Sequence, residues 1–308
     1  MPPEPLPDRF AGGLLGLALG DALGAPHEGG PLERLVWRAI GRTRDGKRRW
    51  TDDTAMALDV AESLVERGML DQGDLAARFA RSHRWSRGYG PGTAKLLRRV
   101  RRGQDWRTLA ATVFPGGSCG NGGAMRAPVV GLLYWNDAAR LSTATRASAE
   151  ITHAHPLGIE GAQIVAHATA AAVASADADG IRDAARAQAV SPDFKRVFEF
   201  ADRWQAANAD VPPREIARAL GNGTLATQSC VTAVHLATRF LDREFNDLID
   251  CVARLRGDVD TIGAMAGAIW GAARGVYTLP DDAIDDLEDV PRLRRAAARL
   301  FALAAVAD

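Results

Sequence analysis

Two segments far apart in the chain each place two carboxylates and a threonine hydroxyl directly before an apolar helical pattern. The first is Trp50-Thr51-Asp52-Asp53-Thr54, and the second is Gly257-Asp258-Val259-Asp260-Thr261. Thr and Asp are favoured helix N-caps, and acids in a first turn complement the helix dipole. One carboxylate is enough for a cap, so the second carboxylate in each segment is surplus. Because unpaired charge beside an apolar surface is costly, the surplus acids favour a bound divalent cation.

The ligand atoms that these segments offer are all oxygens, and no cysteine or histidine cluster accompanies them. This set suits hard cations such as Mg²⁺ or Mn²⁺, whereas structural Zn²⁺ prefers sulfur or imidazole. If the four aspartates converge, they can form a two-metal site that positions a substrate and activates water. Sequence separation alone does not establish that they meet, so their convergence is an expectation for the structure to test.

A glycine-rich stretch at residues 115–126 reads Pro-Gly-Gly-Ser-Cys-Gly-Asn-Gly-Gly-Ala-Met-Arg. A loop with so few side chains, when it enters a helix, can direct backbone N–H groups toward phosphate oxygens. It matches neither the Walker pattern nor the Rossmann fingerprint, because no strand precedes it. A flexible connector is the more common explanation of an isolated glycine loop. Asn121 and Arg126 favour ligand binding, since each could contact a phosphate or a ribose hydroxyl.

The stretch Thr152-His153-Ala154-His155-Pro156 ends one helical pattern and starts another. One interpretation is a helix C-cap in which a histidine interacts with the last carbonyls. The other is that His153 or His155 contacts substrate at the rim of a site. A metal role is disfavoured, because two histidines at i and i+2 without a third ligand make a poor site.

The elements that would position these groups are helices. Apolar residues recur at helical spacing throughout, and alternation with period two is almost absent, so an all-α fold is expected. Prolines fall between helical segments or at their starts, where proline is tolerated. Besides a first helix within residues 12–24, the expected helices are 55–68, 72–84, 92–102, 137–150, 158–175, 180–189, 193–208, 213–219, 227–240, 244–254, 261–276 and 291–306.

Small residues mark two of these helices. Gly12, Gly16, Gly20 and Gly24 lie in the first, and residues 263–275 carry a glycine at every fourth position. A regular stripe of small residues lets another backbone approach closely. In a membrane such a stripe would indicate helix pairing, but charged residues bracket a segment too short to span a bilayer. A tightly packed central helix is therefore predicted.

Bulk composition narrows the class of protein. Lys+Arg and Asp+Glu both total 38 in 308 residues, so no whole-chain field favours nucleic acid or an anionic membrane, although a local patch remains open. The three cysteines have no paired spacing and fit a reducing compartment. The first residues lack a signal-peptide pattern, and no apolar run is long enough to cross a bilayer. A single-domain cytoplasmic enzyme spanning 1–308, monomeric by default, is the expectation.

Taken together, these motifs resemble the ADP-ribosylglycohydrolase family, which includes dinitrogenase-reductase-activating glycohydrolase and the J1 crystallins. The matching residues extend over almost the whole chain and occur in the family's order. They are residues 13–28, 50–54, 120–126, 152–153 and 257–263. The resemblance implies a compact orthogonal multi-helix bundle with two Mg²⁺ or Mn²⁺ ions.

The resemblance also assigns roles to individual positions. The implied metal ligands are Thr51, Asp52, Asp53, Asp258, Asp260 and Thr261. The implied contacts to ADP-ribose are Ser118, Gly120, Asn121, Gly122, Gly123, Met125 and His153, with the diphosphate and distal ribose at the glycine loop. The candidates for the acid that activates water or assists the leaving group are Glu28, Asp53 and Asp260. The implied reaction is hydrolysis of the glycosidic bond between ADP-ribose and an acceptor.

Two departures from the family pattern stand out. Gln228 occupies a position that often carries an acid, which puts one substrate contact in doubt. The family's Gly-Asp-Asp turn appears here as Gly257-Asp258-Val259-Asp260, which keeps the spacing of the acids.

Two other classes of protein fit part of this pattern. All-α prenyl-diphosphate enzymes also use acidic motifs, but they favour aspartates four apart, and no acid follows Asp53 until Asp59. A non-catalytic ADP-ribose-binding or crystallin-like relative is the remaining alternative, although such a protein has no need of four acids at helix starts. The acceptor, whether arginine, serine, nucleic acid or a small molecule, is not indicated by the sequence.

Overall fold

The computed structural model describes residues 7–175, 177–207 and 209–306, and every regular element in them is helical. This confirms the all-α prediction. The α-helices are α1 (Pro7–Gly24), α2 (Pro31–Ile40), α3 (Asp52–Arg67), α4 (Gln72–Ser82), α5 (Pro91–Val100), α6 (Trp106–Val113), α7 (Ala127–Leu133), α8 (Ala138–Glu150), α9 (Pro156–Val173), α10 (Ala178–Arg186), α11 (Pro192–Ala206), α12 (Pro213–Leu220), α13 (Cys230–Arg239), α14 (Phe245–Leu255), α15 (Val259–Arg274), α16 (Asp281–Asp286) and α17 (Val290–Ala304). Short 3-10 turns are η1 (Ala25–His27), η2 (Trp85–Arg87), η3 (Asn121–Gly123), η4 (Ala226–Gln228) and η5 (Val276–Thr278).

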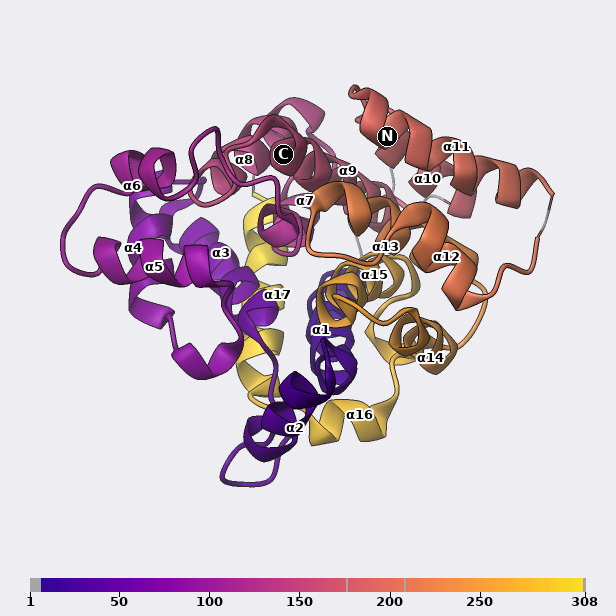
Figure 1. The fold of residues 1–308 in the computed structure, drawn as a ribbon, viewed down its shortest axis with the longest axis horizontal. Coiled ribbons are helices and arrows are strands. Elements are labelled where there is room, and N and C mark those ends of the chain that lie inside the picture. Colours follow the sequence, from indigo (N-terminus) through magenta and orange to yellow (C-terminus); the bar gives the residue numbers. More distant parts are fainter. Residues whose placement is uncertain (1–6, 176, 208, 307–308) are drawn as a thin grey trace.

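Helices α1 and α15 form the centre of the molecule and pack backbone against backbone (Figure 1). Their glycine stripes face each other. A Cβ added at Gly16 would lie 2.2 Å from the carbonyl oxygen of Gly267, and one at Gly20 would lie 1.9 Å from that of Gly263. No side chain fits between the two helices at these levels, which explains the four-residue spacing. The prediction of a tightly packed central helix is confirmed.

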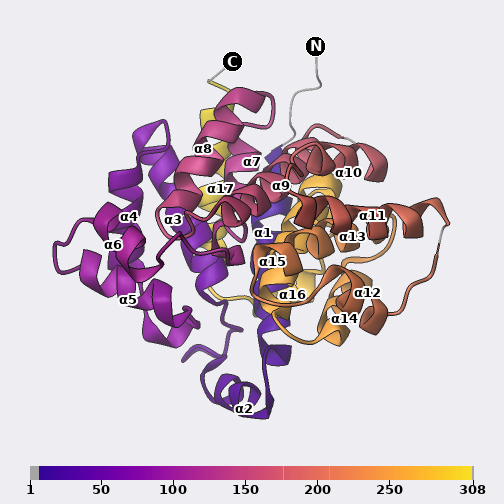
Figure 2. The same cartoon turned by 45° about the horizontal axis from the view of Figure 1, so that its top comes forward.

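The remaining helices surround this central pair. Helices α3 to α6 lie on one side and α10 to α14 on the other, and both views show the same division (Figures 1 and 2). Helix α17 packs against α1 and α3, while α9 contacts α7, α13 and α15. The buried side chains of these layers form one continuous apolar core.

Several helices begin at the residues that sequence signals indicate. Asp71, Asp137 and Ser191 each cap a helix by accepting a hydrogen bond from a backbone N–H three residues later. Helices α2, α6, α7 and α16 were not predicted. They are six to ten residues long, and helices this short gain their stability from neighbours and carry little periodic signal.

None of the helices in the described part of the chain is long and apolar enough to cross a membrane.

Candidate active site

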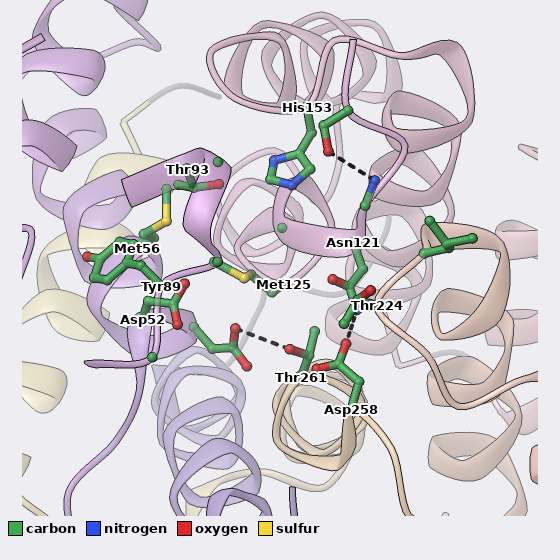
Figure 3. A pocket seen from close by; sticks show the side chains of 18 of the residues that line it. Asp52, Met56, Tyr89, Thr93, Asn121, Met125, His153, Thr224, Asp258 and Thr261 are labelled. Carbon is green, nitrogen blue, oxygen red and sulfur yellow. Dashed lines mark hydrogen bonds between the residues drawn. The ribbon is translucent and has the colours of Figure 1, made fainter. Parts of the chain in front are cut away.

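A cavity of about 630 Å³ opens between the two sides of the molecule, and both acidic segments reach it. Its walls come from the start of α3, the start of α15, the glycine-rich loop, the residues before α5, and Glu28. Asp52, Met56 and Tyr89 lie on one side, and Asn121 and Asp258 lie opposite (Figure 3). The cavity volume falls within the range that small-molecule sites occupy.

The first acidic segment forms the start of α3. Thr51 is the N-cap, and its hydroxyl accepts a hydrogen bond from the Asp53 N–H at 3.2 Å. The cap is therefore made by threonine, which leaves both aspartates surplus, whereas the sequence suggested that only one of them was. Asp52 is half-buried in the cavity wall, whereas Asp53 is only 2% exposed. Thr51 lies buried beneath the wall and is not part of the cavity lining.

The second acidic segment forms the start of α15 and faces the first. The Thr261 hydroxyl donates to Oδ1 of Asp53 at 3.4 Å, which joins two positions 208 residues apart. Asp258 accepts a hydrogen bond from the Asn121 amide at 2.5 Å (Figure 3). The structure thus brings the four aspartates together at one end of the cavity, as the two-metal hypothesis requires.

Two buried oxygens in this cluster have no hydrogen-bond partner among the described residues, namely Oδ2 of Asp53 and Oδ1 of Asp260. Burial raises the pKa of both carboxyls well above the usual value. The charges of neighbouring acids raise it further, Asp21 and Asp52 for Asp53, and Glu28 for Asp260. Carboxylates held this way are strained unless protonated or paired with positive charge.

The donor set fits hard divalent cations. Carboxylate oxygens of Glu28, Asp258 and Asp260 lie within 4.8 Å of one another, and so do those of Asp21, Asp53 and Asp260. Together with the two unpartnered oxygens, these groups offer an all-oxygen environment of the kind that Mg²⁺ or Mn²⁺ binds.

Asp21 is a member of the cluster that the sequence did not single out. It is completely buried on α1 and accepts hydrogen bonds from the N–H groups of Thr51 and Thr54, each at 3.0 Å, and from the Thr54 hydroxyl. Burial raises its pKa to about 6 in spite of these bonds. Since its oxygens are engaged by the 51–54 turn, Asp21 holds that turn in place. The sequence signal that could have identified Asp21 is its position as a lone acid in an apolar, glycine-rich run.

Trp50, the first residue of the first acidic segment, is anchored by an ion pair between Arg87 and Glu288. The guanidinium of Arg87 stacks over the Trp50 ring at 3.8 Å and donates to the Trp50 carbonyl and to the Glu288 carboxylate. The Trp50 indole N–H in turn donates to the Glu288 carbonyl at 3.3 Å. Neither Arg87 nor Glu288 was predicted, because their contact joins residues remote in the chain.

The glycine-rich loop forms another part of the cavity wall and pairs with the segment before η4. The Asn121 N–H donates to the Thr224 carbonyl at 2.9 Å, and the Ala226 N–H donates to that of Cys119 at 3.0 Å. Of the predicted substrate contacts, the residues that line the cavity are Ser118, Gly120, Asn121, Gly122, Met125 and His153, whereas Gly123 does not. The loop is ordered by these contacts and is not a free connector.

Arg126 does not reach the cavity, which corrects the suggestion that it binds a phosphate or ribose. The side chain is completely buried and donates to the Gly122 carbonyl at 2.5 Å and to the Ser148 carbonyl at 2.7 Å. Burial lowers its pKa to about 9. Through its bond to Gly122, Arg126 supports the glycine-rich loop from the protein interior.

The two histidines differ in their roles. His153 is buried in the cavity wall, and a Cβ on Gly122 would lie 2.4 Å from its ring, so this contact requires glycine. Burial lowers the His153 pKa to about 3, and the imidazole is neutral at ordinary pH. His155 is the N-cap of α9, where its ring accepts from the Leu157 N–H at 3.1 Å. His155 therefore starts α9, while at the end of α8 it is the backbone N–H of His153, and not an imidazole, that donates to the Ala149 carbonyl, at 2.7 Å.

Several cavity residues gave no sequence signal. They are Met56, Tyr89, Thr93, Phe114, Thr224 and Leu225. Gln228, the departure noted above, is not among the lining residues, and its side chain packs against Gly223.

Comparisons with known proteins extend over the whole chain. A family model described as ADP-ribosylglycohydrolase matches residues 2–308. ADP-ribosylhydrolase ARH3 of Danio rerio is 33% identical, over 92% of this chain and 89% of that protein, and ARH3 of Homo sapiens is 30% identical, over 95% and 93%. A solved structure described as an ADP-ribosylglycohydrolase-related protein complex superimposes with a TM-score of 0.72 at 29% identity, covering 97% of this chain and 98% of its own. Both acidic segments and the glycine-rich loop fall within these matches.

Proposed function

The chain belongs to the ADP-ribosylglycohydrolase family, and on that premise we propose that it hydrolyses the glycosidic bond between ADP-ribose and an acceptor with the help of two divalent cations, Mg²⁺ or Mn²⁺. The observation that carries the metal part of the proposal is the pair of buried, unpartnered oxygens of Asp53 and Asp260 at one end of the cavity. Such atoms are rare in folded proteins and indicate a missing partner.

The residues proposed to hold the cations are Thr51, Asp52, Asp53, Asp258, Asp260 and Thr261. When bound, the cations would polarise the ribose hydroxyls and offset negative charge near the reacting carbon. Asn121 and Asp21 position the residues proposed to hold the cations. Asn121 orients the Asp258 carboxylate by donating to it, and Asp21 fixes the turn that carries Thr51.

The residues proposed to hold ADP-ribose are Ser118, Gly120, Asn121, Gly122, Gly123, Met125 and His153. The glycines allow close approach of a diphosphate to the backbone, while the neutral ring of His153 closes the wall beside the distal ribose. Because the loop is fixed by its pairing with residues 224–226, it presents a preformed surface. Binding energy from this remote end then positions the scissile bond over the acidic cluster.

Glu28 is the proposed proton-transfer group, with Asp53 and Asp260 as the alternative acids. It is half-buried in the cavity wall, and its carboxylate lies within 4.8 Å of those of Asp258 and Asp260. From this position in the cavity wall it would accept a proton from the attacking water or protonate the leaving group. General acid–base assistance of this kind contributes about 10²–10⁴-fold in rate.

The test is release of ADP-ribose from ADP-ribosylated substrates in the presence of Mg²⁺, in EDTA, and by the Asp260→Asn and Glu28→Gln variants. We expect turnover with Mg²⁺, loss of turnover in EDTA and in Asp260→Asn, and a fall of about 10²–10⁴-fold for Glu28→Gln. Undiminished turnover in EDTA and in Asp260→Asn would rule out the metal mechanism. Stable association with an ADP-ribosyl peptide, without product, would instead support a non-catalytic binding protein.

A further inference from the structure

A very short turn carries Asp258 into the cavity wall. Residues 256–258 alone separate α14 from α15. Within this turn Arg256 has a φ of 61° and Gly257 a φ of 79°. A residue with a side chain stays in the left-handed region only where the surrounding structure holds it there. The turn therefore depends on a partner outside itself.

Asn222 is that partner, and it contacts the turn on both sides. Its side-chain amide donates to the carbonyl of Leu255 at 2.9 Å and to that of Arg256 at 3.0 Å. These bonds satisfy carbonyls that the end of a helix leaves without helical donors. The carbonyl of Asn222 in turn accepts a hydrogen bond from the Asp258 N–H at 2.9 Å. One residue thus fixes both the end of α14 and the N-cap of α15.

The contact between Asn222 and the turn leaves no room for a side chain at Gly257. A Cβ there would lie 2.1 Å from the carbonyl oxygen of Asn222, which explains the glycine that precedes Asp258. The Gly257 carbonyl also accepts a hydrogen bond from the Gly29 N–H at 3.3 Å. A displacement of this turn would therefore shift Asp258 and the segment that carries Glu28 together.

Asn222 is itself anchored to the body of the protein. The hydroxyl of Thr232, a completely buried residue of α13, donates to the Gly221 carbonyl at 2.8 Å. Gly221 has a φ of 95°, and a Cβ there would lie 2.6 Å from the Cα of Gln228. None of these contacts involves a carboxylate, so the anchor does not depend on a cation in the acidic cluster.

Two asparagines act on Asp258 in different ways. Asn121 lines the cavity and donates to the Asp258 carboxylate at 2.5 Å, so it orients the side chain (Figure 3). Asn222 lies outside the cavity lining and bonds to the backbone, so it sets where the main chain of Asp258 lies. Asp260 follows in the first turn of α15, and its position depends on the same turn.

We propose that Asn222 is a positioning residue for the divalent cations, because it sets the backbone from which Asp258 and Asp260 extend. This inference rests on the proposed metal-dependent function. Without the amide, Arg256 is released from its left-handed conformation and the turn relaxes. The two acids then depart from the arrangement that a hard cation such as Mg²⁺ demands of its oxygen ligands. Partners that orient metal ligands typically contribute about 10–100-fold to metal affinity.

Cation binding is tested by calorimetric titration of the metal-free protein with Mg²⁺ and with Mn²⁺, at a temperature where every variant is folded. Asn222→Ala and Asn222→Leu both remove the amide donors, and leucine keeps the branched shape of asparagine. Both variants should raise Kd about 10–100-fold. The matched control is Asp71→Ala, which removes the N-cap of α4 that accepts from the Asp74 N–H at 2.9 Å. It should lower Tm, as the loss of a cap does, and leave Kd unchanged.

Hydrogen–deuterium exchange in EDTA provides a readout that needs no metal. Exchange over residues 255–262 should be faster in Asn222→Ala than in the wild type, and unchanged in Asp71→Ala. An unchanged Kd in both Asn222 variants would overturn the inference, as would an equal rise of Kd in Asp71→Ala or unchanged exchange over 255–262. If the wild type binds neither cation, the proposed metal mechanism fails. If the wild type binds and the Asn222 variants bind equally well, only the inference about Asn222 fails.

Discussion

Removal of the charge on Asp260 is expected to stabilise the protein when no divalent cation is bound. Oδ1 of Asp260 is buried without a partner, and the nearby carboxylates of Glu28, Asp53 and Asp258 raise its pKa beyond the effect of burial. Asp260→Asn keeps the size of the side chain and removes the repulsion. The same variant lacks a charged ligand, so it should also lose the stabilisation that Mg²⁺ gives to the wild type.

The expected effects are large enough that Asp260→Asn should be more stable than the wild type without Mg²⁺ and less stable with it. An unsatisfied buried polar group costs about 1–3 kcal/mol, and more if it is charged, so the metal-free variant should gain at least about 1 kcal/mol in its free energy of unfolding. Each kcal/mol corresponds to about 2–4 °C in Tm for a larger domain. At a Mg²⁺ concentration about 100 times Kd, the wild type gains about 2.7 kcal/mol and becomes the more stable protein.

The assay is thermal unfolding followed by circular dichroism, in EDTA and in Mg²⁺, with Asp74→Asn as the matched control. Burial raises the pKa of Asp74, but hydrogen bonds from Arg78, Ser63 and Arg67 outweigh it and bring the pKa to about 2. Loss of that charge should cost about 2 kcal/mol, equally with and without Mg²⁺. The reasoning is refuted if Asp260→Asn is destabilised in EDTA as Asp74→Asn is, or if Mg²⁺ leaves the wild-type Tm unchanged.

Three further substitutions test the scaffold and the charges around the site. Gly16→Ala would place a Cβ 2.2 Å from the Gly267 carbonyl oxygen, and urea unfolding should show a loss of at least about 1–3 kcal/mol; an unchanged midpoint would contradict the packing described. Asp21→Asn removes one of the two oxygens that hold the turn before Thr54, so calorimetry should show weaker Mg²⁺ binding, and equal affinity would exclude the positioning role. Burial raises the pKa of Asp59 to about 6, so the folded protein binds this proton more tightly, and stability falls by about 2 kcal/mol as pH rises from 4 to 7. Asp59→Asn should flatten this decline in urea unfolding at the two pH values, and an identical decline in the variant would be evidence against it.

The sequence contains strong local signals for most of the fold and for the chemistry of the site. Helical periodicity locates the long helices to within a few residues, because their buried faces must repeat every three or four positions. The surplus acids at residues 52–53 and 258–260 identify the candidate metal ligands, because a cap needs one side chain and these segments have more. Both signals are local, because the residues that make them lie within one or two helical turns of one another in the sequence.

What sequence could not supply is contact between remote segments. The hydrogen bond from Thr261 to Asp53 spans 208 residues, and the Arg87–Glu288 pair spans 201. Arg126 shows the converse error, since an arginine in a glycine loop suggested ligand binding until its complete burial was visible.

Helix α1 provides a common reference for the two acidic segments. Asp21 accepts hydrogen bonds from the turn that starts α3, while one helical turn later a Cβ at Gly24 would lie 2.6 Å from the Asp260 Cα at the start of α15. The glycine pairs along α1 and α15 fix the axial register of those helices, because carbonyl oxygens occupy the space that a Cβ would need. Any sliding of α1 would therefore move both acidic segments relative to each other. The glycine stripe, which carries no chemistry itself, is what allows acids from opposite ends of the chain to share one cluster.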